Sequence, residues 1–170
     1  MRRGRAAFIS VRAARDDDGP QLMRLIGGVF AEYPGCVLDV DGEMPELRAI
    51  RSTMPRVGGA FWVAEQDQRV VGCVGYVPTE AGVELKKLYV ELFARRGGLA
   101  SRLCALVEEA ARVARAPRIE LWSDTRFIPA HRFYEARGYV KTGQTRELFD
   151  QSATVEYHFS RDLSGAGVIR

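Results

Sequence analysis

The sequence predicts one α/β domain in which a single mixed β-sheet carries helices on both faces. The expected elements follow the order β-α-α-β-β-β-α-β-α-β-β, so strands and helices are interleaved along one chain. Residues 83–123 have the pattern strand, helix, strand, which is typical of a parallel crossover. The 170 residues contain no internal repeat and no clear linker. We therefore expect one domain over 8–163, with loose termini at 1–7 and 164–170.

The first half of the chain is expected to supply a strand, two helices and a hairpin. Residues 8–14 alternate in polarity as a strand does. Apolar side chains then recur at spacings of three and four over 22–33, which predicts a helix ended by "PG". "CVLDVDGEMP" is expected to be a loop, and 44–56 a short second helix with an irregular end. Two β-rich runs flanking "DQ" predict the hairpin.

The second half is expected to form the crossover and the end of the sheet. After the turn "EAG", strand 83–90 leads into a helix of about sixteen residues, on which Glu108 and Arg112 have the spacing of an ion pair. A buried strand follows at 117–123. The helix at 129–138 begins with proline and ends with glycine. "YVKTGQTRELF" and "ATVEYHFSRDL" are expected to be the last two strands.

Composition indicates a globular protein and argues against a nucleic-acid or membrane partner. The chain is 46% hydrophobic and 28% charged, with no apolar run of membrane-helix length and no signal-peptide pattern. Its net charge of +3 equals the charge of Arg2, Arg3 and Arg5, so the rest of the chain sums to zero. We interpret the excess as a basic tip of the chain rather than a nucleic-acid face.

The cysteines argue against zinc and disulfides. Cys36, Cys73 and Cys104 are odd in number and widely spaced, and no CxxC pair exists. Cys73 and Cys104 lie in apolar surroundings and are expected in the core. Reduced thiols fit a cytoplasmic location.

The stretch "FARRGGLASRL" (93–103) predicts an anion site. It joins a strand to the start of a helix, where the first N–H groups have no partners and carry partial positive charge. Glycine lets a ligand approach the backbone closely, while Arg95 and Arg96 add full charges. Phosphate is the usual occupant of such a site. The spacing matches neither an NTPase P-loop nor the dinucleotide fingerprint.

Two segments of the chain resemble the GNAT family of N-acetyltransferases. The pattern R-x-x-G-x-A, formed by Arg95, Gly98 and Ala100 within "KKLYVELFARRGGLASRLCALVEEA", is similar to the family's pyrophosphate loop. "AHRFYEARGYVKTG" resembles the second family signature, A-x-x-x-Y-E-x-x-G-F. The resemblance covers about residues 8–163 and implies a GNAT-like acyl-CoA N-acyltransferase fold.

The resemblance implies that acetyl-CoA is the cosubstrate and that its acetyl group passes to a primary amine by direct attack in a ternary complex. Leu88 and Tyr89 would line the pantetheine arm, and the amide of Val90 would donate to the thioester oxygen. The pyrophosphate would lie on the loop formed by Arg95, Arg96, Gly97, Gly98, Leu99 and Ala100.

The resemblance also implies a base and an acid. Glu84 lies where the family often has a glutamate that accepts the proton of the amine. A surface charge near a strand start is the alternative for Glu84, and Glu120 is a second choice as base. Tyr134 falls on the signature tyrosine, whose hydroxyl would protonate the leaving thiolate. A core position is the alternative for Tyr134, and the two roles are compatible.

One position departs from the family pattern. Phe127 stands where many relatives have an asparagine that helps to hold the cofactor arm, and either Ser123 or Asp124 takes over this polar role or no residue does. His131 and His158 have no partner at metal-ligand spacing. We interpret both histidines as structural or surface residues and expect no metal.

The sequence indicates less about the acceptor amine than about the cofactor. Asp39, Asp41 and Glu43 lie in a loop of the acceptor side and would favour a cationic amine, unless the loop is merely solvated. An amino acid, a polyamine, an antibiotic-like amine and a protein lysine all remain open, as do a monomer and a homodimer. A non-catalytic acyl-CoA-binding module is the alternative function, and the second signature argues against an unrelated phosphate-binding protein.

Overall fold

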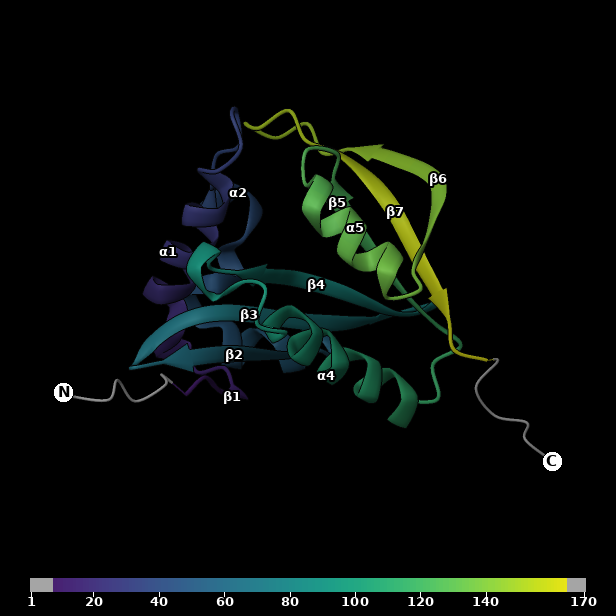
Figure 1. Ribbon diagram of the computed structural model, residues 1–170, viewed down its shortest axis with the longest axis horizontal. Coiled ribbons are helices and arrows are strands. Elements are labelled where there is room, and N and C mark those ends of the chain that lie inside the picture. Colours follow the sequence, from purple (N-terminus) through teal and green to yellow (C-terminus); the bar gives the residue numbers. More distant parts are fainter. Residues whose placement is uncertain (1–7, 165–170) are drawn as a thin grey trace.

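The computed structural model describes residues 8–164 and contains the predicted mixed sheet, with helices on both faces (Figure 1). The expected loose termini, apart from residue 164, lie outside the described residues. In that described part the strands are β1 (Ser10–Ala13), β2 (Ala60–Gln66), β3 (Arg69–Thr79), β4 (Gly82–Val90), β5 (Arg118–Asp124), β6 (Val140–Glu147) and β7 (Val155–Asp162), in the sheet order β1-β2-β3-β4-β5-β7-β6. The helices are α1 (Gly19–Phe30), α2 (Val40–Glu43), α3 (Ile50–Thr53), α4 (Leu99–Val113) and α5 (Ile128–Ala136).

The region between α1 and β2 differs most from the expectation. The predicted second helix is split into 3-10 turns at Pro45–Ala49 and Met54–Val57 on either side of the short α3. Each of these turns has a proline in its first positions, where the ring lacks the N–H that a continuing helix needs. The expected loop before them contains α2, whose N-cap Asp39 accepts a hydrogen bond from the Gly42 amide at 3.0 Å.

The predicted hairpin is confirmed. Asp67 and Gln68 join β2 to β3 with φ angles of 49° and 65°, the positive values that a tight two-residue turn requires. The third strand also pairs as expected, because β3 and β4 run antiparallel along most of their lengths.

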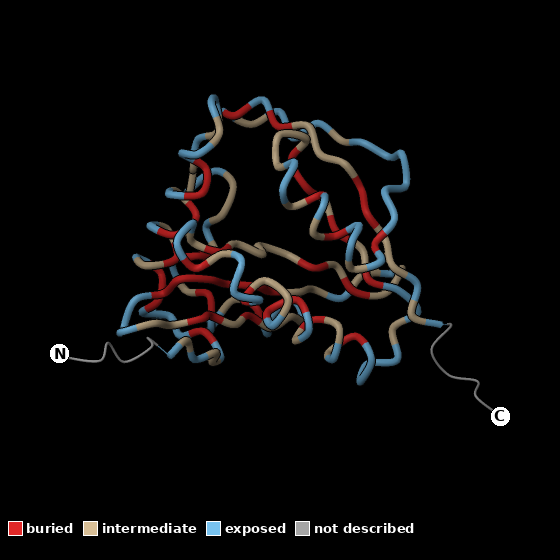
Figure 2. The backbone as a smooth tube through the Cα atoms, viewed as in Figure 1, coloured by how far each residue is buried: buried red, intermediate tan, exposed pale blue. Residues whose placement is uncertain are grey.

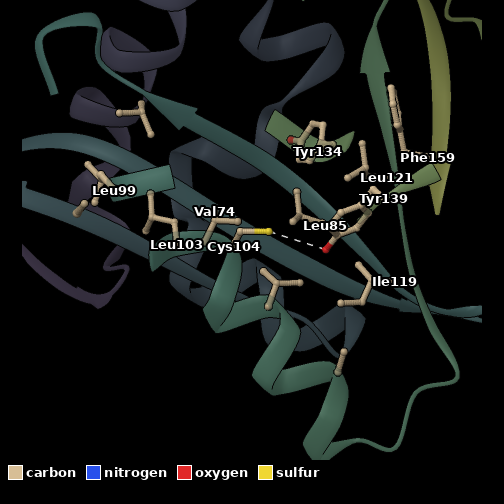
Figure 3. Close-up of a cluster of buried hydrophobic side chains, with 14 of the residues drawn as sticks. Val74, Leu85, Leu99, Leu103, Cys104, Ile119, Leu121, Tyr134, Tyr139 and Phe159 are labelled. Carbon is tan, nitrogen blue, oxygen red and sulfur yellow. Dashed lines mark hydrogen bonds between the residues drawn. The ribbon is translucent and has the colours of Figure 1, made fainter. Parts of the chain in front are cut away.

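Two hydrophobic clusters fill the two faces of the sheet. Figure 2 shows buried stretches in the central strands and in the helices packed on them. One lies under α4 and α5 and includes Leu103, Leu121 and Phe159 (Figure 3). The other lies under α1. Cys73 and Cys104 are both buried, as predicted. Within residues 8–164, no helix has the length and apolar character that a membrane crossing requires.

The polar side of α4 is paired differently from the prediction. Arg112 bonds Glu109 at 2.6 Å instead of Glu108. The Glu108 carboxylate accepts hydrogen bonds from Arg137 at 2.7 Å and from Arg161 at 3.0 Å. This pairing ties α4 to the end of α5 and to β7, so Glu108 belongs to a tertiary contact and not to the exposed helix surface.

The central parallel pair of strands separates soon after it begins. β4 and β5 are in register only at Val83 with Ile119 and at Glu84 with Glu120, as the predicted crossover requires. β4 then continues to Val90 with β3 on one side only. This separation opens the sheet at its centre and positions the candidate site.

Candidate functional site

A cleft of about 970 Å³ opens where β4 and β5 separate. Parts of α1, α2, β4, β5, α5, the start of α4 and the loop between β6 and β7 border it. Most of the predicted site residues meet there: Glu84, Leu88, Tyr89, Val90, Arg95, Arg96, Gly98, Leu99, Ala100 and Tyr134. Of the predicted residues, Gly97 and the second-choice base Glu120 do not border the cleft.

The start of α4 presents unpaired amides to this cleft. Gly98 is the N-cap, with a φ of +81° that favours glycine. The Arg102 amide donates to the Gly98 carbonyl at 3.0 Å, so the N–H groups of residues 99–101 precede the first bond of the helix. A Cβ added to Gly97 or Gly98 would meet nothing within 4 Å. The helix start is therefore open to a ligand and favours a negatively charged group.

The two arginines of the loop have different surroundings. Arg95 forms two hydrogen bonds with the Glu32 carboxylate, at 2.6 and 2.8 Å, and a third with the Val90 carbonyl at 2.9 Å. Its charge is thus compensated, and its side chain ties the loop to α1 and β4. Arg96 is exposed and has no ion pair within residues 8–164. Arg96 is therefore the arginine with an uncompensated charge beside the helix start.

The edge of β4 that β5 leaves carries free backbone groups. The Glu91 amide donates to the Val71 carbonyl on β3 at 2.8 Å. Successive amides of a strand point to opposite sides, so the Val90 N–H faces the open edge. The alternation does not extend back to Leu88, because a β-bulge at Lys87, whose φ is +54°, shifts the register between β3 and β4. An extended chain with polar groups could bind along this edge as an additional strand would.

Tyr134 combines a buried ring with an available hydroxyl. The residue is 5% exposed, and its ring contacts Phe133, Tyr139 and Phe159 at centroid distances of 5.5, 5.8 and 5.9 Å. In Figure 3 the hydroxyl points away from Phe159 and Leu121. It has no hydrogen-bond partner among the described residues, and burial raises the pKa of Tyr134 above its ordinary value. The phenol therefore holds its proton and can donate it into the cleft.

Glu84 lies at the point where the two strands separate. Its side chain is 15% exposed, and its carboxylate is 3.0 Å from the Lys86 ammonium. Glu120, its neighbour on β5, accepts a hydrogen bond from Thr79 at 3.0 Å and lies 3.2 Å from Nε2 of His158. Between the two candidate bases, Glu84 is the one that faces the cleft.

Both histidines are buried and hydrogen-bonded. Nε2 of His131 lies 2.9 Å from the Asp124 carbonyl, and burial lowers the pKa of His131. Nδ1 of His158 lies 2.8 Å from the Thr142 hydroxyl. Neither side chain borders the cleft, and residues 8–164 contain no group of three or more side chains that could hold a metal ion.

Phe127 borders the cleft as an apolar residue. Its ring packs on Tyr33 at a centroid distance of 4.7 Å. Ser123 and Asp124 border the cleft beside it, and the Asp124 carboxylate bonds the Arg126 guanidinium at 2.7 Å. Asp124 is thus the nearby polar group, with its charge compensated.

The sequence reading missed the loop between β6 and β7. Leu148, Asp150, Ser152 and Thr154 of this loop all border the cleft. The sequence showed only a polar stretch between two strands, and such a stretch does not reveal where the loop lies in the fold. The Ser152 hydroxyl and the Val37 backbone exchange hydrogen bonds of 2.9 and 3.2 Å, so the loop is attached to the segment before α2.

Only one of the three acids expected at the acceptor rim faces the cleft. Asp39 caps α2 and also accepts a hydrogen bond from Gln151 at 2.8 Å. Asp41 pairs with Arg48 at 2.8 Å on the surface. Glu43 borders the cleft.

Comparisons with known proteins show the family and the fold of the chain. The family profile described as "Acetyltransferase (GNAT) domain" matches residues 57–141. N-acetyltransferase 8 of Homo sapiens is 34% identical over 74% of this chain, which spans only 56% of the length of that relative. The uncharacterized N-acetyltransferase YjgM of Escherichia coli (strain K12) is 32% identical, and the match covers 72% of this chain and 76% of the length of YjgM. PaiA N-acetyltransferase from Thermoplasma acidophilum, solved in complex with coenzyme A, has a similar fold, with a TM-score of 0.70 at 15% identity over 91% of this chain and 99% of its own.

Proposed function

The chain belongs to the GNAT family of N-acetyltransferases, and we propose that it transfers the acetyl group of acetyl-CoA to a primary amine by direct attack in a ternary complex. The single observation that carries this proposal is the cleft at the separation of β4 and β5. It brings an open helix start, a free strand edge, a carboxylate and the hydroxyl of a buried tyrosine ring to one space. The coenzyme A complex of the Thermoplasma acidophilum protein, which has a similar fold, supports the choice of cosubstrate.

The pyrophosphate of the cosubstrate is assigned to the start of α4. Three amides, the positive end of the helix and the free charge of Arg96 favour an anion there. The pantetheine arm is assigned to the edge of β4, where the Val90 amide is free to donate. This placement extends the polar arm along an edge that would otherwise leave its backbone groups unpaired.

Glu84 is proposed as the base. Acetyl-CoA supplies an activated acyl group, but a primary amine with a lysine-like pKa is protonated near neutral pH and cannot attack in that form. Glu84 is a cleft-facing carboxylate at the strand separation and can accept the amine proton directly or through a water molecule. The Lys86 ammonium, 3.0 Å away, is its ion-pair partner in the structure.

Tyr134 is proposed as the acid. The leaving sulfur departs as a thiolate that needs a proton, and a phenol held in its neutral form by burial can supply it. The Tyr134 hydroxyl needs no rearrangement of protein hydrogen bonds to do so. The three free cysteines support the further proposal of a reducing, cytoplasmic location.

Two measurements test the function and separate it from an acyl-CoA-binding module without catalysis. Isothermal titration calorimetry with CoA measures the binding, and thiol release from acetyl-CoA against a panel of small and peptide amines measures the transfer. The enzyme proposal requires both signals. Binding without thiol release for any amine in the panel would leave the binding module as the function.

A pair of glycine variants tests the cofactor end. Gly98→Leu places a side chain over the amides of α4 and should abolish CoA binding. Gly143→Leu is the matched control, because Gly143 also has a positive φ and open space around it but lies on β6, away from the cleft. Each variant should cost about 1–2 kcal/mol of stability. The loop assignment is wrong if folded Gly98→Leu binds CoA as well as the control does.

A further inference from the structure

One carboxylate at the acceptor end of the cleft lacks a partner. The Oε1 atom of Glu43 is buried without a hydrogen bond, and it is the only such side-chain atom among residues 8–164. Burial raises the pKa of Glu43, and the carboxylates of Asp150 and Asp39 raise it further. A buried polar atom without a partner destabilises the folded protein. A ligand that donates a hydrogen bond to Glu43 would remove this penalty.

A second carboxylate without a cationic partner lies beside the first. Asp150 borders the cleft and accepts a hydrogen bond from the Thr154 amide at 2.8 Å. Burial opposes its ionisation, but hydrogen bonds from backbone amides hold the pKa of Asp150 below its ordinary value. Asp150 therefore stays negatively charged, and its charge reaches Glu43.

The other charged side chains that border this part of the cleft are compensated. The pairs are Glu84 with Lys86 at 3.0 Å, Lys87 with Glu46 at 2.6 Å, Asp124 with Arg126 at 2.7 Å and Arg146 with Glu156 at 2.6 Å. The uncompensated charge at this end is therefore negative and belongs to Glu43 and Asp150, which border the cleft, and to Asp39, which does not. A bound cation would neutralise part of this negative charge, whereas a bound anion would be repelled by these carboxylates.

Two loops close the cleft beside these carboxylates. Figure 1 shows that the segment before α2 and the loop between β6 and β7 meet on the side of the molecule away from α4. The joint consists of the Ser152–Val37 hydrogen bonds and the bond between Gln151 and Asp39 at 2.8 Å. An acceptor whose cationic end reaches Glu43 and Asp150 would lie against this joint, which favours a small molecule.

We propose that Glu43 and Asp150 form a subsite for a second positive charge on the acceptor, so that the preferred acceptors are α,ω-diamines and longer polyamines. This inference rests on the proposed acetyl transfer. One amine of the acceptor lies near Glu84 and reacts, while the remote ammonium donates hydrogen bonds to Glu43 and Asp150. A monoamine of the same length lacks the remote contact, and an ω-amino acid brings a carboxylate to two carboxylates.

Calorimetry on the CoA-saturated protein tests the subsite without requiring turnover. The probes are cadaverine, pentylamine and 5-aminopentanoate, which share one chain length and differ in the remote group, with spermidine as a longer polyamine. Because a hydrogen bond to a charged group is worth about tenfold in affinity or more, cadaverine should bind at least about tenfold more tightly than pentylamine. The amino acid should bind most weakly of the matched three.

Charge-removing variants identify the residues. Glu43→Gln and Asp150→Asn should each reduce the preference for cadaverine over pentylamine by about tenfold. Asp41→Asn is the matched control, since Asp41 lies in the same short helix as Glu43 but pairs with Arg48 on the surface. The control should keep the full preference.

The outcomes separate this inference from the proposed function. Selective cadaverine binding that Glu43→Gln abolishes, without thiol release, supports the subsite while rejecting the transfer. Four outcomes overturn the subsite, even if pentylamine is acetylated. The three matched probes could bind equally, 5-aminopentanoate could bind best, or none of the probes could bind. The fourth outcome is that both charge-removing variants keep the full preference for cadaverine.

Discussion

The role proposed for Tyr134 can be tested by removing one oxygen atom. Tyr134→Phe keeps the ring and its contacts with Phe133, Tyr139 and Phe159, at 5.5 to 5.9 Å. It removes a hydroxyl that has no hydrogen-bond partner among the described residues. No protein hydrogen bond is lost with the oxygen, so the free energy of unfolding should change by less than about 0.5 kcal/mol. CoA affinity should also stay the same.

The rate should respond very differently. Loss of a general acid typically costs about a hundredfold or more, which corresponds to about 2.7 kcal/mol of transition-state stabilisation. Because burial raises the pKa of Tyr134, the wild-type phenol keeps its proton as pH rises through the ordinary tyrosine range. The wild-type kcat should therefore show no decrease from tyrosine ionisation up to about pH 10.

The assay is single-turnover thiol release with acetyl-CoA and a saturating amine, so that product release does not mask the chemical step. Tyr139→Phe is the control, because the Tyr139 hydroxyl lies in the same cluster but bonds Glu108 at 3.4 Å and does not border the cleft. The control should lose up to about 1 kcal/mol of stability and no activity. If Tyr134→Phe reacts within about twofold of the wild type, Tyr134 is a core residue only.

Three other substitutions test the remaining carboxylates. Glu84→Gln should lower kcat/KM most near neutral pH and recover as pH rises and free amine accumulates; a pH profile with the wild-type shape would exclude Glu84 as the base. Glu108→Gln should lower the free energy of unfolding in urea by about 1–3 kcal/mol, because it leaves Arg137 without its carboxylate. Burial opposes the ionisation of Glu108, but Arg137 holds the pKa of Glu108 below its ordinary value. The stability that the Glu108 carboxylate contributes is therefore lost as pH falls through that lowered pKa. If the wild type and Glu108→Gln differed by the same free energy of unfolding at every pH down to about 2, this explanation would be refuted. Glu43→Gln should raise Tm at neutral pH, because burial raises the pKa of Glu43 and its ionisation therefore destabilises the fold. The increase in Tm should vanish in acid, where wild-type Glu43 is protonated. An unchanged Tm at neutral pH would contradict this reasoning.

The features that the sequence alone determined are local in the chain. The turn at Asp67 and Gln68, the start of α4 and the helix that carries Tyr134 each depend on residues within a few positions of one another. Turn chemistry, helix capping and hydrophobic periodicity act over that distance, so a pattern in the sequence is enough to place them. The family resemblance rests on the same contiguous segments.

The pairing of charges was decided by the tertiary structure. Arg95 was expected to supply free charge to the anion site, but it is bound to Glu32 on α1. Glu108 was expected to pair along its own helix, but it bonds residues beyond the end of α5 and on β7. A long side chain on a helix reaches whatever packs beside it, and its sequence neighbours do not reveal that contact.

The cleft itself also depends on the tertiary structure. The separation of β4 from β5 follows from a register that holds at only two residue pairs, and neither strand carries a local signal for it. Glu43 and Asp150 are far apart in the sequence and approach each other because Ser152 and Gln151 are bonded to the segment before α2. Strand register and loop docking are set by packing between distant segments, so the sequence identified the chemistry at the start of α4, and the fold decided which carboxylates face the acceptor.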